Sequence, residues 1–312
     1  MQLARGLVFL SAIVLSQVSF AQEFTPVIGW EEQLFPSYII STATMKTVPV
    51  EEEATEEEET VDAAKEEEAA GEEPAVEILG KEDGLLGAEL VSPGKNVAVK
   101  LTITCDEIME PSTFSGTLPE KGVTYQVMPN IKYKFRKLAE FDQATPVSMT
   151  FKLQVGKAPA TEQTATVMIR PINDCPFMLV YGDDQVQDIG YTFAAYVNEQ
   201  HPFLDKVLRE ALDRQIVDSF IGYQGDDDDV LRRVYALWDT LVMRDVRYSS
   251  ITATAVESET VSSQHVRLID QSINNAQANC VDGSVLFASL LRKIGIDPFL
   301  VLVPVSIAPL DS

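Results

Sequence analysis

Apolar and polar positions alternate with a period of two through much of residues 88–175. In residues 96–105, NVAVKLTITC, the apolar side chains fall on one face and the lysine and threonines on the other. The same alternation is present in residues 131–137 (IKYKFRK), 146–155 (PVSMTFKLQV) and 164–171 (TATVMIRP). This spacing is typical of strands with one buried face, because successive side chains of a strand point to opposite sides. The pattern predicts four strands, with Pro and Gly in the segments between them.

The strands predict an antiparallel β-sandwich of the immunoglobulin-like kind over residues 85–178. Cys105 ends an early strand on its inward face, and Cys175 follows the last strand. A bridge between them would close a loop of about 70 residues and stabilise the fold by roughly 4 kcal/mol in the chain-entropy model. We expect this disulfide; two separate buried thiols are the alternative.

From about residue 180 the apolar spacing becomes helical. Apolar residues three and four apart predict a helix after His201-Pro202 and another after the aspartates 226–229, whose charge favours a helix N-terminus. A third helix is predicted from Cys280 to Lys293, with Gly295 at its C-terminal end. Residues 246–256 are predicted as extended, 262–277 as an irregular lead-in, and 299–304 (FLVLVP) as a buried strand.

The first 21 residues have the features of a signal peptide. Arg5 gives a positive start, residues 7–15 are apolar, and Ser19-Phe20-Ala21 offers small residues at the cleavage positions. An N-terminal membrane anchor is the alternative. No later run is apolar enough to cross a bilayer. We therefore expect an exported protein, periplasmic or extracellular, with no membrane span after signal removal. The odd count of three cysteines then indicates a reactive thiol or an intermolecular link.

Charge divides the remaining N-terminal part of the chain. Residues 22–50 are apolar enough to pack as an arm on a later domain, whereas 51–84 are predicted to be a disordered acidic linker. Residues 51–73 alone have a net charge of −12, from 12 Glu, Asp62 and Lys65, out of −24 for the whole chain. No basic patch is present, so a nucleic-acid partner is disfavoured. Neither this run nor residues 226–229 have the ligand spacing of a calcium loop, so we expect no metal and no cofactor.

Cys280 is the candidate catalytic residue. It follows the polar loop 274–279 and begins a predicted helix. Helix N-termini present unpaired N–H groups and lower the pKa of a thiol, which favours the nucleophilic thiolate. On the residues alone, a nucleophile and a structural cysteine at a helix start both remain open.

Residues 278–304, ANCVDGSVLFASLLRKIGIDPFLVLVP, closely resemble the signature of the transglutaminase-like superfamily. Its pattern is Asn-Cys-x-Asp at a helix start, a Leu/Ala-rich helix, a Gly-Ile turn and a strand. Residues 194–212 and 234–241 also resemble its bacterial exported branch, so the likeness spans about 185–304. The resemblance implies an α+β fold of the papain-like cysteine protease type and acyl transfer on a protein or peptide amide, with the cell envelope as a candidate setting. Cys280 corresponds to its nucleophile.

The catalytic His and Asp of the family have no counterpart here. The place of the His is taken by residues 305–308, and His201 and His265 do not match it, although His265 could approach Cys280. We therefore expect the domain at 179–312 to be incomplete, truncated before its remaining strands, and severely impaired in turnover. The alternative is a non-catalytic binding or structural protein that uses the sandwich and a degenerate domain.

Overall fold

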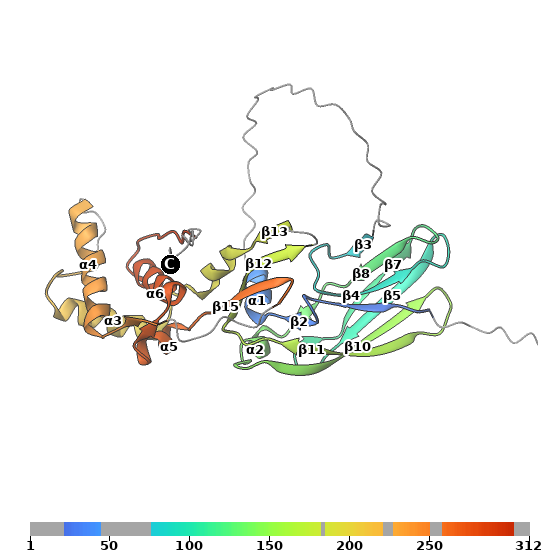
Figure 1. Ribbon diagram of the computed structural model, residues 1–312, viewed down its shortest axis with the longest axis horizontal. Helices are drawn as coiled ribbons and strands as arrows, with labels where there is room; N and C mark the ends of the chain where they lie inside the picture. The colour runs from blue at the N-terminus through green and yellow to red at the C-terminus, as the bar shows by residue number, and fades with distance from the viewer. Residues whose placement is uncertain (1–21, 45–75, 182–184, 221–226, 250–257, 303–312) are drawn as a thin grey trace, which may run out of the picture.

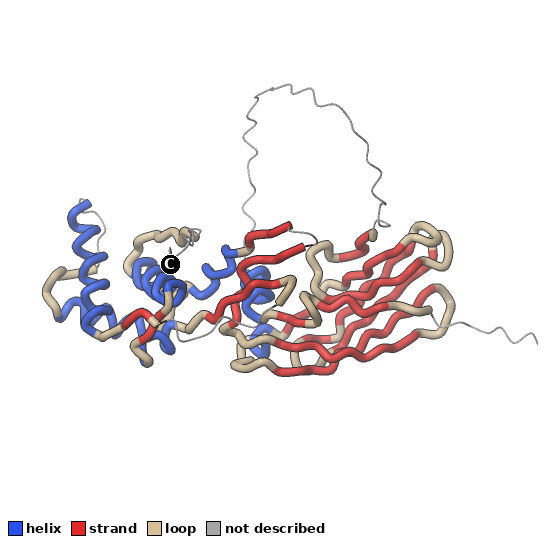
Figure 2. Tube along the Cα trace, in the orientation of Figure 1, coloured by secondary structure: helices blue, strands red, loops and turns tan. Residues whose placement is uncertain are grey.

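The structure is a computed structural model that describes residues 22–44, 76–181, 185–220, 227–249 and 258–302. The predicted signal peptide, residues 51–75 of the predicted linker and the stretch 305–308 lie outside the described residues. The fold is mixed α+β. Figure 1 shows the strands gathered at one end of an elongated molecule and most helices at the other, and Figure 2 shows the same division by secondary structure.

Two sheets enclose the larger core. The four-stranded sheet has the order β1 (Thr25–Ile28), β4 (Leu86–Val91), β8 (Thr124–Met128) and β3 (Glu77–Gly80). The five-stranded sheet has the order β2 (Gln33–Leu34), β11 (Thr161–Ile169), β10 (Thr145–Val155), β5 (Val97–Thr104) and β7 (Ser112–Leu118). Inward side chains of both sheets, among them Leu86, Tyr125, Leu101 and Phe151, form one buried cluster. The two sheets therefore form a β-sandwich (Figure 1).

The period-two pattern identified β5, β10 and β11 correctly but missed β7 and β12 (Asp174–Tyr181). On β5, Val99, Leu101 and Ile103 are buried while Lys100 between them is exposed, and β10 alternates in the same way along all its 11 residues. The strand predicted over 131–137 is wrong. Only β9 (Lys132–Tyr133) is extended, paired with β6 (Met109–Glu110), and α2 (Phe135–Leu138) follows. This single helical turn buries Leu138 in the core, which a continued strand would not do.

The predicted arm is an integral part of the fold. β1 pairs antiparallel with β4, and β2 pairs parallel with β11, so residues 25–34 add a strand to each sheet. α1 (Pro36–Thr44) then packs beyond the sandwich against β12 (Asp174–Tyr181) and the 3₁₀ helix η1 (Gly190–Tyr196). The linker predicted to extend to residue 84 is also shorter than expected, because β3 pairs parallel with β8.

The predicted Cys105–Cys175 disulfide is wrong, because both thiols are free and lie in different cores. Cys105 belongs to the sandwich core, whereas Cys175 lies on β12 among Phe193, Tyr196 and Val266. β12 leaves the sandwich and forms a separate sheet of order β13 (Gln185–Asp188), β12, β15 (Val261–His265). Burial raises the pKa of Cys105 to about 11 and that of Cys175 to about 12.

The C-terminal part packs four helices around a second core. They are α3 (Pro202–Asp213), α4 (Asp227–Met243), α5 (Ile269–Asn274) and α6 (Cys280–Lys293), and the short parallel pair β14 (Arg247–Tyr248) and β16 (Gln277–Ala278) lies beside them. α3, α4 and α6 follow the prediction, with Leu204, Val207 and Leu237 fully buried. The irregular lead-in predicted over 262–277 is wrong, because it contains β15, α5 and β16. No helix in the described part of the chain is long and apolar enough to cross a membrane.

The strand predicted over 299–304 is also wrong for the residues that the structure describes. Residues 299–302 pair with no strand there, and Phe299 and Val301 are 91% and 77% exposed. An apolar run becomes a strand only where a neighbouring strand accepts its backbone hydrogen bonds. The segment instead places the side chain of Leu302 against the backbone of Gly190, where a Cβ atom would lie 2.2 Å from Leu302 Cδ1.

Candidate functional site

Cys280 is the first residue of α6 and its side chain is exposed. The preceding residue, Asn279, is the N-cap: its Oδ1 accepts from the backbone N–H of Asp282 at 2.8 Å. Asp282 Oδ2 accepts in turn from the Asn279 backbone N–H at 2.9 Å, which completes a reciprocal capping box. The direction in which the chain enters the helix at Cys280 is therefore fixed by two hydrogen bonds around it.

A buried ion pair supports the capping box from below. Asp282 is fully buried, and its Oδ2 accepts from Arg267 Nη1 at 2.6 Å while its Oδ1 accepts from the Arg267 backbone N–H at 2.7 Å. Arg267 lies between β15 and α5 and is itself buried. The first turn of α6 is thus joined to the connection between β15 and α5. These contacts hold the backbone at Cys280 in place.

The buried face of α6 contacts two cores. Val285 packs with Cys175 and Val266, on the side of the β13-β12-β15 sheet. Leu286 and Leu290 pack into the helical core formed with α3, α4 and α5. At the exposed start of the helix, Ser284 Oγ donates to the Cys280 carbonyl at 2.7 Å. The thiol is therefore presented to solvent by a helix that is held from both sides.

The structure does not bring His265 to Cys280. His265 lies opposite Asp174 across the β12–β15 pair, with Nδ1 at 3.7 Å from Asp174 Oδ1. The next residue, Val266, packs with α6, and successive side chains of a strand point to opposite faces, so His265 points away from α6. Within the described part of the chain, its side chain makes no hydrogen bond to Cys280; the link between the regions is backbone, from Asn279 Nδ2 to the His265 carbonyl at 3.5 Å.

Asp174 is already neutralised by a different residue. Its Oδ2 accepts from Arg170 Nη2 at 2.6 Å and from Arg170 Nε at 3.0 Å, and both side chains are buried. The serine of α1, Ser37, donates to the Asp174 carbonyl at 2.5 Å. Asp174, Arg170 and His265 therefore form a structural cluster beneath α1 and not the partners of a nucleophile.

His201 has a structural role as well. It is the N-cap of α3, where its Nδ1 accepts from the Phe203 backbone N–H at 3.3 Å. Of the aspartates predicted at the start of the next helix, Asp226 lies outside the described residues; α4 begins at Asp227, and Asp229 binds Arg233 at 2.8 Å. Among the residues that the structure describes, no group of three His, Cys, Asp or Glu side chains could hold a metal ion.

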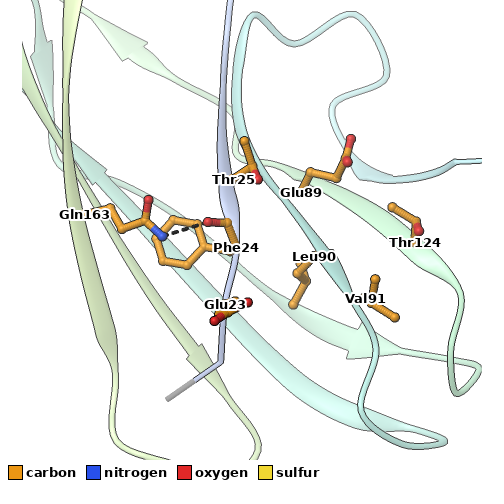
Figure 3. Close-up of a pocket in the computed structure, with 8 residues that line it drawn as sticks. All are labelled: Glu23, Phe24, Thr25, Glu89, Leu90, Val91, Thr124 and Gln163. Carbon is orange, nitrogen blue, oxygen red and sulfur yellow. Dashed lines mark hydrogen bonds between the residues drawn. The ribbon is translucent and has the colours of Figure 1, made fainter. Parts of the chain in front are cut away.

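Two hollows in the surface lie away from Cys280. One, of about 430 Å³, lies between β1, β4 and β11, and Figure 3 shows Gln163 reaching across it to the Phe24 carbonyl, a bond of 2.7 Å. The other, of about 250 Å³, is lined by α1, the turn before β4 and the chain around β9, and includes Tyr38 and Tyr133. Neither is lined by the candidate nucleophile.

Sequence reasoning missed Arg267. The spacing of Asn279 and Asp282 is that of a capping box and was visible in the sequence. Arg267, 12 residues before Asn279, stood in a segment that was predicted as irregular. No protein-family model matches the chain. No curated protein is significantly similar to it in sequence. Its function is therefore inferred from the residues around Cys280.

Proposed function

We propose that this protein is an exported transglutaminase-like cysteine acyltransferase or protease whose nucleophile is Cys280. Its C-terminal α+β part would be a transglutaminase-like domain of the papain-like protease type, preceded by an immunoglobulin-like sandwich. The substrate would be a protein or peptide amide, in the periplasm, at the cell envelope or outside the cell. With no histidine beside Cys280, acylation would be retained and turnover would be severely impaired.

The observation that supports this proposal most directly is the contrast between the three thiols. Cys280 is exposed at the start of a 14-residue helix whose first turn is fixed by the buried Asp282–Arg267 pair. Cys105 and Cys175 are buried, and burial raises the pKa of both. Only Cys280 combines access to a substrate with a rigid position. The wider resemblance of residues 278–304 to the transglutaminase-like signature supplies the reaction class.

The chemistry begins with attack by Cys280 Sγ, as the thiolate, on the amide carbonyl carbon. The carbonyl oxygen becomes an oxyanion, which the free N–H groups of a helix N-terminus can stabilise. The C–N bond then breaks, the amine leaves with a proton, and a thioester remains on Cys280. Water or a second amine attacks the thioester and restores the thiol. In a complete triad, histidine moves these protons; here solvent would have to do so.

The test separates acylation from turnover. The full chain is mixed with an activated ester, p-nitrophenyl acetate, and the released nitrophenol and the protein mass are followed together. We expect one acetyl group on Cys280 and a burst close to one equivalent, followed by slow deacylation. Cys280→Ser should abolish the burst, whereas His265→Ala, the matched control, should change its rate by less than about twofold because the imidazole faces the other side of β15.

Three results would contradict the proposal: no acetylated peptide containing Cys280, an undiminished burst in Cys280→Ser, or rapid amide turnover that Cys280→Ala leaves intact. A slow burst in His265→Ala would instead identify His265 as the general base, and would show that its side chain reaches Cys280. Glutamine-containing peptide and a primary amine, supplied to the same preparation, test whether any acyl group is passed on.

A non-catalytic binding or structural role is the second candidate function. It is favoured by the exposed apolar side chains of α4 and of residues 299–302, which are unusual on a surface that makes no contact. The ester assay distinguishes the two functions, because a binding protein does not need an acylated Cys280.

A further inference from the structure

α4 has two apolar faces, and in the described part of the chain only the inner face is buried. The inner face buries Ala236, Leu237 and Leu241 against the other helices. The outer face has a row of four large apolar side chains, which we name the α4 apolar row: Leu231, Tyr235, Trp238 and Val242. Each is between 53% and 64% exposed. Figure 1 shows α4 at the end of the molecule away from the sandwich, where a partner can approach it.

The spacing of the α4 apolar row is that of a helix–helix seam. Its residues follow one another at intervals of four, three and four, the alternation of the a and d positions of a heptad, over two heptads. Such a row fits into the holes of a second helix with the same spacing, and α4 itself supplies that spacing. We propose that the α4 apolar row is the contact surface of a homodimer, in which α4 packs antiparallel on α4 of a second copy.

Charge beside the row favours the antiparallel direction. Arg232 and Asp239 each follow a row residue by one position, so they lie on the same flank of the row. A two-fold axis across the middle of the row places this flank of one copy beside the same flank of the other, which brings each Arg232 close to the other copy's Asp239, a carboxylate that also accepts from Arg214 Nε of its own chain. In a parallel pair this flank would instead face Val234 and Leu241, where an arginine finds no partner.

The exposed area indicates a weak dimer. Met243, beside the row, is 62% exposed and extends it. Five such side chains on each of two copies offer on the order of 1,000 Å² of buried surface, the lower limit for a specific interface. Trp238 already makes an edge contact to Phe287 of α6, with ring centroids 5.9 Å apart, so its ring is held in place before association. We expect dissociation in the micromolar range of protein concentration.

Sedimentation velocity of the full chain between about 1 and 100 μM tests the dimer. The sedimentation coefficient should rise with concentration from monomer to dimer, since a micromolar equilibrium lies inside this range. Trp238→Glu and, separately, Tyr235→Glu should raise the dissociation constant by at least about tenfold, because an aromatic side chain at the centre of an interface is replaced by a charge. Val186→Glu, at an equally exposed valine on β13, is the matched control and should leave it unchanged. Circular dichroism confirms that each variant is folded.

Cross-linking tests the direction of the helices. In a Cys280→Ser background, Leu231→Cys and Val242→Cys proteins are mixed and oxidised; an antiparallel pair places these positions together, so a mixed disulfide dimer should form. Leu231→Cys alone should not cross-link, because the two copies of residue 231 then lie about 16 Å apart along the axis. A chain that stays monomeric at 100 μM, a dimer insensitive to Trp238→Glu, or cross-linking of Leu231→Cys with itself would overturn the proposal.

Discussion

At the scale of single residues, burial decides what each cysteine can do. Cys175 Sγ lies 3.3 Å from Thr192 Oγ1 inside a closed core, and Cys105 directly follows β5 in the sandwich, 3.3 Å from a Glu107 oxygen. Both environments disfavour a thiolate: burial is the main cause, and the nearby carboxylates of Glu107 and Asp174 contribute. Cys280 is exposed, so a reagent or substrate can reach its thiol.

Alkylation should therefore be selective. At pH 7.5 in native buffer, iodoacetamide should modify Cys280 and leave Cys105 and Cys175 largely unmodified, since their thiols are shielded and have pKa values of about 11 and about 12. Peptide mapping with a second, isotopically distinct alkylating agent added after denaturation measures the protected fraction. Rapid native labelling of Cys175 would show that the core formed with η1 is open in solution.

At the scale of elements, the first turn of α6 depends on a polar contact between parts of the chain 15 residues apart. The Arg267–Asp282 pair joins α6 to the end of β15, while Asn279 closes the helix end. In a buried pair of this kind, each charge is tolerated only because the other is present. The position of Cys280 at the start of α6 therefore depends on Asp282.

Asp282→Ala should destabilise the protein by about 3 kcal/mol, because it leaves the Arg267 guanidinium buried without its partner and also removes half of the capping box. Urea unfolding monitored by circular dichroism measures the change. Asp83→Ala is the control: its pair with Lys81 is largely exposed, so the free energy of unfolding should change by less than about 0.5 kcal/mol. Equal effects of the two substitutions would contradict a buried, paired role for Asp282.

The same contact shows where prediction from sequence stops. β5, β10 and β11 and the helices α3, α4 and α6 were identified because their burial follows one repeating period over eight or more residues. α2, α5 and the exposed segment at 299–302 were missed, because short runs have no clear period and take their conformation from their neighbours. Cys280 and the capping box could be seen locally, but neither the partner of Asp282 nor the face to which His265 points is encoded within one element.

At the scale of the whole molecule, the pKa values of several buried ionisable groups are all raised, so their contributions to stability change with pH in the same direction. Burial raises the pKa of Tyr38 to about 12 and that of Tyr196 well above its usual value of 10.0, in addition to the two buried thiols. Each of these groups is neutral when protonated, and the folded protein holds its proton more tightly than the unfolded chain. Their contribution to stability is full below the unfolded pKa of about 9 to 10 and is lost as the pH rises towards the folded values.

The free energy of unfolding should therefore fall by several kcal/mol between pH 8.5 and pH 11, because each such group costs up to about 1.4 kcal/mol for each pH unit above its unfolded pKa. Urea titrations at several pH values measure the slope. In Cys175→Ala the slope should be shallower, since one of the groups no longer titrates. A free energy that stays constant up to pH 11 would show that these side chains are hydrated in the folded protein.

The N-terminal arm has a consequence for how the two ends of the molecule move. Residues 25–34 are strands of the sandwich, yet Phe35, the next residue, is buried with Leu179, Ile189 and Val261 of the neighbouring sheet, and Ser37 binds the Asp174 carbonyl. One short segment is thus built into both parts, which suppresses a hinge between them. Under the proposed function, a macromolecule bound to the sandwich would then meet Cys280 at a fixed separation, and the arm would restrict substrates by their length.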